Sequence, residues 1–259
     1  EPIYSRQSFE KDNKIIFKAR SQEPWGTVAL LGRNTAGSKL SFVEFNDGSG
    51  SFSDQFTFTS MFSIHNTSDI QLKNMNFKNN HFFDDMVHLI YSSNINMTNL
   101  SFLNAFGDAI DIDICKNIKI KNSTFINSKN DGIDLMESDV NISDVKIYNS
   151  QDKAISIGEA STAKLSNSRL EKNKFAIAVK DSSKTYIRKA EFINNQIQIA
   201  SYKKNLQYGA GGEAIIDESI FKSKVNNFTS SDSKILIKNS KILGDLKKSG
   251  GQITINARK

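Results

Sequence analysis

The sequence predicts an all-β fold, a right-handed parallel β-helix whose coils of 22 to 25 residues stack into a solenoid capped at both ends. A repeated acidic strand is the first observation: Gly107–Asp113 reads Gly-Asp-Ala-Ile-Asp-Ile-Asp, and Asn130–Leu135 repeats its frame 23 residues later. The second is a large apolar residue that recurs at intervals of 25, 23, 22, 23 and 22 residues, at Phe77, Phe102, Phe125, Ile147, Leu170 and Phe192. The third is an Asn two residues after most of these positions, at Asn79, Asn104, Asn127, Asn149 and Asn194.

Each repeat contains short alternating strands, such as residues 109–113 and 118–121, separated by Asn, Ser, Gly and Asp. Parallel strands of successive coils stack about 4.8 Å apart, so the recurrent apolar side chains should form an inner column and the Asn side chains amide ladders at the corners. Right-handedness follows from the usual hand of parallel crossovers. Leucine-rich repeats have a similar period, but they need a Leu-x-x-Leu-x-Leu frame and a helical segment in each unit, which this chain lacks.

We expect one domain over residues 1–259. Residues 1–55 should form the N-terminal cap and first coils, residues 56–201 the regular coils, and residues 202–259 a loop and the C-terminal coils. The loop is the segment Tyr202–Gly212, which is basic, aromatic and Gly-rich and interrupts the period. Only 14 Gly and 2 Pro are present, so Asn, Asp and Ser must make the corners.

The composition limits the compartment and the partners. The single Cys115 excludes an intrachain disulfide, no apolar run could span a membrane, and no signal peptide is visible after Glu1, although one could have been removed. The net charge of +6 is asymmetric, because residues 84–159 carry 10 Asp and 2 Glu against 6 Lys. The basic remainder is not a continuous stripe with interleaved aromatics, so we expect a polyanionic glycan and not nucleic acid as partner.

Strand alternation predicts an acidic face over the middle coils. It sends Ile110 and Ile112 inward and Asp111 and Asp113 outward. Stacking then gives a middle column of Ser63, His88, Asp111, Asp134, Ser156 and Ala178, a corner column of Asp85, Asp108, Asp131 and Lys153, and a third column of His65, Ile90, Asp113, Met136, Gly158 and Lys180.

Carboxylates about 5 Å apart repel each other unless a cation, a shared proton or a paired base compensates. We therefore expect raised pKa values on this face. A structural interpretation is that the acids form turns, keep an exposed sheet soluble or hold a structural Ca²⁺. A functional interpretation is a substrate site where acids act as general acid and base, or hold Ca²⁺ against a uronate.

The Asn-x-x-Phe units and the stacked Asp-x-Ile-Asp strands, over about residues 56–201, resemble right-handed parallel β-helix proteins of the pectin-lyase-like superfamily. That resemblance implies binding, cleavage or epimerisation of polysaccharides. More narrowly, Asp84–His88, Asp108–Asp113 and Ile155–Glu159 resemble β-helix regions that accompany spore-coat-H-type kinase domains in large secreted bacterial proteins. This implies a secreted or cell-surface location and neighbouring domains, but no activity. The Gly-His-Gly and Arg-Ile-Lys of polygalacturonases are absent, so their hydrolytic roles do not transfer.

The sequence thus predicts an extracellular β-helix that processes an acidic polysaccharide, by hydrolysis or by Ca²⁺-assisted lysis. The alternative is a non-catalytic glycan-binding or structural module, so enzymatic activity stays open. The predicted catalytic residues are Asp108, Asp111, Asp131 and His88. The predicted substrate-binding residues are Asp85, Asp113, Asp134, Lys153, Glu159, Lys180, Tyr202 and Tyr208. Ca²⁺ is the one cofactor that the acids suggest, and no metal ligands are assigned.

Overall fold

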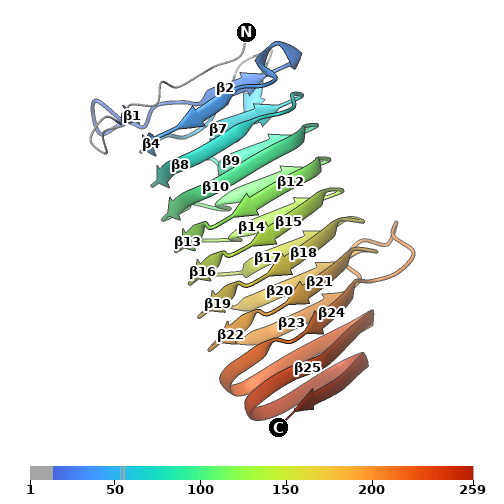
Figure 1. The fold of residues 1–259 in the computed structure, drawn as a ribbon. Helices are drawn as coiled ribbons and strands as arrows, with labels where there is room; N and C mark the ends of the chain where they lie inside the picture. The colour runs from blue at the N-terminus through green and yellow to red at the C-terminus, as the bar shows by residue number, and fades with distance from the viewer. Residues whose placement is uncertain (1–13, 53, 55, 259) are drawn as a thin grey trace.

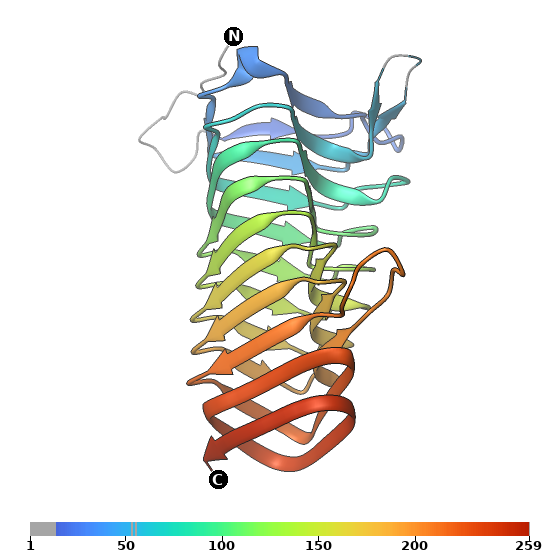
Figure 2. The same cartoon turned by 90° about the vertical axis from the view of Figure 1, so that its right-hand side faces the viewer.

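The computed structural model describes residues 14–52, 54 and 56–258, and it has the predicted architecture, a parallel β-helix (Figures 1 and 2). The coils follow one another along the axis, from β1 near the N-terminus to β25 at the C-terminus. None of the helical structure in these residues is long and apolar enough to cross a membrane. Residues 1–13, which belong to the predicted N-terminal cap, lie outside the described residues.

Three parallel sheets run along the solenoid. The first contains β2 (Val28–Leu31), β7 (Ser60–His65), β9 (Asp85–Ile90), β11 (Ile110–Asp113), β14 (Ile133–Met136), β17 (Lys153–Gly158), β20 (Phe175–Lys180) and β23 (Ile197–Tyr202). The second contains β3 (Lys39–Ser41), β12 (Lys116–Lys121), β15 (Asp139–Ser143), β18 (Thr162–Ser166), β21 (Lys184–Arg188) and β24 (Glu213–Asp217). The third contains β1 (Ile15–Phe17), β4 (Val43–Asn46), β13 (Thr124–Ile126), β16 (Lys146–Tyr148), β19 (Arg169–Glu171) and β22 (Glu191–Ile193).

Longer strands connect these sheets. The strands β8 (Gln71–Lys78) and β10 (Ser93–Leu103) pass through a corner and pair in both the second and the third sheet. The last strand, β25 (Ile220–Arg258), pairs with β22, β23 and β24 and so winds through all three. A short antiparallel hairpin of β5 (Ser51–Phe52) and β6 (Thr57–Phe58) and a 3-10 turn at Arg33–Thr35 lie outside the coils.

The predicted apolar column is confirmed. Phe77, Phe102 and Phe125 pair in register, and the column continues through Ile147, Leu170 and Phe192 to Phe221. All of these side chains are buried. The Phe77 and Phe102 ring centroids lie 4.9 Å apart with nearly parallel planes, and those of Phe102 and Phe125 lie 4.7 Å apart. Stacked aromatic rings and branched side chains therefore fill the interior from coil to coil.

The predicted Asn ladders are also present. Asn127 donates from its side-chain nitrogen to the side-chain oxygen of Asn104 (3.0 Å), and Asn149 donates in the same way to Asn127 (2.9 Å). These three residues have φ between 59° and 61°, the left-handed region that Asn tolerates better than most residues. The Asn residues thus turn the chain and tie one coil to the next.

One feature differs from expectation. Tyr202 is the last residue of β23, because it continues the strand alternation beside Lys180, so the irregular loop begins at Lys203 and not at Tyr202.

Candidate functional site

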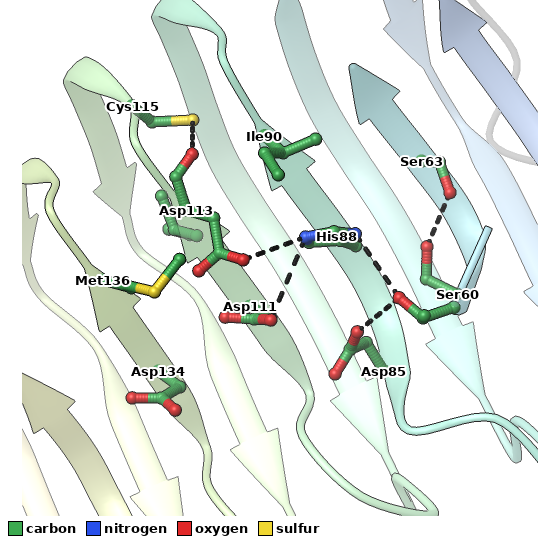
Figure 3. A network of polar contacts seen from close by, with 12 residues as sticks. Ser60, Ser63, Asp85, His88, Ile90, Asp111, Asp113, Cys115, Asp134 and Met136 are labelled. Atoms are coloured by element: carbon green, nitrogen blue, oxygen red, sulfur yellow. Dashed lines mark hydrogen bonds and ion pairs between the residues drawn. The ribbon is translucent and has the colours of Figure 1, made fainter. Parts of the chain in front are cut away.

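The acidic residues gather on the outward face of the first sheet, as the column argument predicts (Figure 3). The middle column pairs Ser63 with His88, His88 with Asp111 and Asp111 with Asp134, and then continues to Ser156 and Ala178. The next outward column pairs His65 with Ile90, Ile90 with Asp113, and Asp113 with Met136, which is followed by Gly158. We call the residues Asp85, His88, Asp108, Asp111, Asp113, Asp131 and Asp134 the acidic face.

The corner column of the acidic face is buried and serves the backbone. Asp85, Asp108 and Asp131 are only 3%, 4% and 1% exposed. Asp108 Oδ1 accepts the backbone N–H of Asp131 (2.6 Å), and Asp131 Oδ1 accepts the backbone N–H of Lys153 (2.8 Å). These two carboxyl groups hold the next coil in place, which is a structural role that the sequence did not indicate.

His88 lies at the centre of a polar network. Its Nε2 lies 3.5 Å from Asp113 Oδ2 and 3.9 Å from Asp111 Oδ2. Its Nδ1 lies 3.4 Å from the Thr59 hydroxyl, which in turn donates to Asp85 Oδ2 (2.9 Å). The His65 ring meets the His88 ring edge-on, with centroids 4.9 Å apart. The side chains of His88, Asp111 and Asp113 are 12%, 23% and 17% exposed, so a ligand could reach this part of the face.

Burial raises several carboxyl pKa values. Burial, followed by repulsion from Asp131, raises the pKa of Asp108 to about 9. Burial also raises the pKa of Asp131 to about 7, although attraction from Lys153 opposes the shift. The pKa values of Asp85 and Asp111 lie well above that of a free Asp, again chiefly through burial. The expected shifts are present, but the larger cause is removal from water and not mutual repulsion.

Three groups on this face have ligand atoms close enough together to hold a metal ion. They are His88 with Asp111 and Asp113, Asp84 with Asp85 and Asp108, and Asp108 with Asp131 and Asp134. Carboxylate oxygens suit Ca²⁺. Gly107 has no side chain, and this leaves room for the Asp84 carboxylate to approach Asp108. A Cβ atom at position 107 would collide with that carboxylate. In the third group, however, one oxygen each of Asp108 and Asp131 is already occupied by a backbone N–H.

The predicted substrate-binding cations lie toward the C-terminal side of the acidic face. Lys153 Nζ contacts Asp131 Oδ2 at 3.4 Å and also contacts Asp152. Lys180 is buried and its side chain passes over Gly158, where an added Cβ would lie 3.0 Å from Lys180 Cε. Both lysine side chains therefore lie against the outward face of the first sheet and are largely shielded from solvent.

The remaining predicted residues mark one corner, under the Lys203–Gly212 loop. Glu159 Oε1 accepts from the side-chain nitrogen of Asn205 (3.2 Å), and burial raises the pKa of Glu159. Tyr202 pairs with Lys180 across neighbouring strands, and Tyr208 lies within the loop. Asp181 fixes the same loop, because its Oδ1 accepts the backbone N–H groups of Lys204 (2.6 Å) and Asn205 (2.8 Å).

Sequence reasoning missed three kinds of residue near the face. Thr59 lies immediately before β7 and Asp181 lies in a turn, so neither falls in the strand frame that carried the prediction. Two exposed aromatic side chains, Phe82 and Phe106, lie in the corners that precede β9 and β11, where 72% and 44% of their surface is exposed. An aromatic residue inside a polar corner segment was the signal that could have identified them.

Comparisons with known proteins agree with the fold. The family model described as "Right handed beta helix region" matches residues 60–221. No curated protein sequence matches the chain. A solved alginate lyase from Paenibacillus sp. str. FPU-7 superimposes with a TM-score of 0.65 and 13% identity, covering 91% of this chain and 94% of its own.

Two further solved structures are similar. The periplasmic alginate epimerase AlgG has a TM-score of 0.59 and 15% identity, covering 83% of this chain and 50% of its own. An endo-xylogalacturonan hydrolase from Aspergillus tubingensis has a TM-score of 0.58 and 13% identity, covering 95% of this chain and 87% of its own. At these identities the likeness establishes the fold.

Proposed function

The chain belongs to the right-handed β-helix family, and from that premise we propose that it processes an acidic polysaccharide on the acidic face. The observation that carries the proposal is the cluster of His88, Asp111 and Asp113 beside buried carboxyl groups. A surface selected only for solubility would not bury acids whose pKa values rise as a result.

The cluster has the groups that acid–base cleavage requires. Because burial favours the protonated form of Asp111, its carboxyl group could give a proton to the leaving glycosidic oxygen. His88 could remove the proton beside a uronate carboxylate in lysis, or accept a proton from the attacking water in hydrolysis. Asp113 and Asp134 would orient the sugar or His88. Asp108 and Asp131, which are less exposed than Asp111, remain proposed proton carriers and also hold the corner.

Charged and aromatic groups near the face support an acidic sugar as substrate. Lys153 and Lys180 lie beside the acids and would attract a uronate carboxylate. Phe82 offers an exposed apolar surface on which a sugar ring could rest, whereas Lys129 Nζ lies 4.5 Å from the centroid of the Phe106 ring and covers one face of it. Glu159, Tyr202 and Tyr208 would contact the substrate farther along the solenoid. Asp85 would help to orient His88 through Thr59, whose hydroxyl group contacts both side chains.

Ca²⁺-assisted lysis is the second form of the proposal. The group of Asp84, Asp85 and Asp108 favours it, because its oxygen atoms are of the ligand type that Ca²⁺ prefers. Bound Ca²⁺ would offset the charge of these acids and attract the substrate carboxylate.

A non-catalytic glycan-binding or structural module is the alternative function. The hydrogen bonds from the Asp131 and Lys153 backbones to Asp108 and Asp131 favour it, since they give two of the acids a purely structural use. Under either function we propose a secreted or cell-surface bacterial protein, in which this β-helix accompanies other domains such as a spore-coat-H-type kinase.

The test is turnover of a panel of uronate-containing and neutral polysaccharides, with and without a chelator. Asp111→Asn should abolish cleavage of whichever glycan the unmodified protein cleaves and leave the β-rich circular dichroism spectrum unchanged. Asp139→Asn, an exposed acid of the second sheet, is the matched control and should keep full activity. Full activity of Asp111→Asn would refute the acid–base role, and no turnover on any glycan would favour the non-catalytic alternative.

A further inference from the structure

The second sheet carries a run of basic side chains that sequence reasoning did not recognise. Two of its outward columns contain Lys39, Gln71, Asn96, Lys119, Asn141, Lys164 and Tyr186, and Ser41, Lys73, Thr98, Lys121, Ser143, Ser166 and Arg188. These fourteen positions hold six cations and no acid. We call Lys39, Lys73, Lys119, Lys121, Lys164 and Arg188 the basic strip. Its strands, including β12, β15, β18 and β21, lie side by side along the solenoid (Figure 1).

The strip was missed because its members are far apart in the sequence. Lys121 and Lys164 are separated by 43 residues, yet only one strand, β15, lies between theirs. The lysines are scattered along the sequence, but the pairing of the strands places their side chains on one face of the second sheet. Only one aromatic residue, Tyr186, lies in these columns, so the strip is not the continuous basic stripe with interleaved aromatics that nucleic-acid binding would require.

The lysines of the strip are not neutralised by acids. Lys39, Lys73, Lys119, Lys121 and Lys164 are exposed, and within residues 14–52, 54 and 56–258 none of them forms an ion pair. The third sheet is different, because three of its cations are matched by acids: Lys78 with Glu44 (3.2 Å), Arg169 with Glu171 (2.6 Å) and Lys222 with Glu191 (2.9 Å). The two columns of the strip hold no acid over seven coils, although Asp139 lies elsewhere on the second sheet, and solubility alone would not require that. Acids appear at the C-terminal end of the strip, where Arg188 pairs with Glu218 (2.7 Å).

The strip also has a hollow along it. Short side chains at Asn141, Ser143 and Ser166 form the floor between Lys119 and Lys121 on one side and Tyr186 and Arg188 on the other. The hollow has a volume of about 360 Å³. The Tyr186 hydroxyl donates to Asp217 Oδ2 (3.0 Å), which fixes a half-exposed ring at one end.

We propose that the basic strip is a second binding surface, which holds an acidic polysaccharide extended along the solenoid axis. Cations one or two coils apart would meet successive carboxylate or sulfate groups of such a chain, at intervals of roughly 5 to 10 Å. The fixed Tyr186 ring would support one sugar ring. A single aromatic residue in a shallow hollow suits a sugar better than single-stranded nucleic acid, for which several stacking rings are usual. This surface is separate from the acidic face and does not depend on catalysis there.

The experiment measures binding of polygalacturonate to the intact protein by isothermal titration calorimetry. The triple variant Lys119→Glu, Lys121→Glu, Lys164→Glu should bind at least about tenfold more weakly, because close charge pairs are replaced by repulsion. The control Lys146→Glu, Lys224→Glu, Lys241→Glu makes the same change of net charge at exposed positions outside the strip and should bind like the unmodified protein. Asp111→Asn should also retain strip binding, which separates this proposal from the proposed activity.

Three further arms decide the class of partner. Binding should weaken as salt screens the charges, and neutral galactan of similar length should not bind. Tyr186→Ala should weaken binding, whereas Tyr186→Phe should retain it because the ring remains. Equal losses in both triple variants would overturn the strip as a site, and tighter binding of single-stranded DNA than of polygalacturonate would overturn the assignment to a glycan.

Discussion

The buried carboxyl group of Asp108 makes the stability of the fold depend on pH. Its pKa is about 9 in the folded protein and about 3.9 in an unfolded chain, so the folded state holds the proton more tightly. The same holds for Asp131, with a pKa of about 7. The stabilisation that comes from protonated Asp108 and Asp131 is therefore fully present below about pH 4. It is lost as the pH rises through the folded-state pKa values, about 7 for Asp131 and about 9 for Asp108.

We accordingly expect the free energy of unfolding to fall between pH 5 and pH 9, by on the order of a few kcal/mol. Urea titrations at both pH values measure this difference. Asp108→Asn retains an oxygen that can accept the Asp131 N–H but cannot ionise, so it should remove part of the fall. Identical pH dependence of the variant and the unmodified protein would show that Asp108 ionises as freely in the fold as in water.

At the scale of a structural element, the aromatic column determines whether neighbouring coils stay together. Phe125 is fully buried between the Phe102 ring and Ile147. Phe125→Ala should lower the free energy of unfolding by about 3–5 kcal/mol, and Phe125→Leu by less, because Leu fills more of the space. Urea unfolding followed by circular dichroism measures both. A loss below about 1 kcal/mol for the Ala variant would mean that the coils close over the cavity.

Elements that repeat were predictable from the sequence, and elements that interrupt the repeat were not. The positions of Phe102 and Asn127 follow from a fixed period, and the pairing of Asp111 with His88 follows from that period and strand alternation. The hydrogen bonds of Asp108 depend on the detailed path of a corner, which no periodicity describes. Thr59 lies just outside strand β7, and the Lys203–Gly212 loop lies where the period fails.

For the whole molecule, linear stacking makes stability depend on position along the axis. A coil such as that of β11 to β13 has neighbours on both sides, whereas much of the surface of residues 241–256 is exposed. In a solenoid, each repeat is stabilised mainly by its neighbours. We expect amide hydrogen exchange, followed by mass spectrometry, to be fastest over residues 241–258 and slowest in β10 to β16. Uniform exchange along the chain would instead indicate one all-or-none unit.

The attachment of the Lys203–Gly212 loop to one corner fixes its distance from the acidic face along the solenoid axis. Asp181 and Glu159 fix the loop to one corner, while Asp111 lies on β11, four strands before Tyr202 in the first sheet. Each strand adds about 4.8 Å, so the acids and the loop are set roughly 19 Å apart. Loss or gain of a complete coil between them would change that separation in whole steps without altering either end. If the acidic face and the loop contact the same glycan, as proposed, related chains with different numbers of coils would select oligosaccharides of different length.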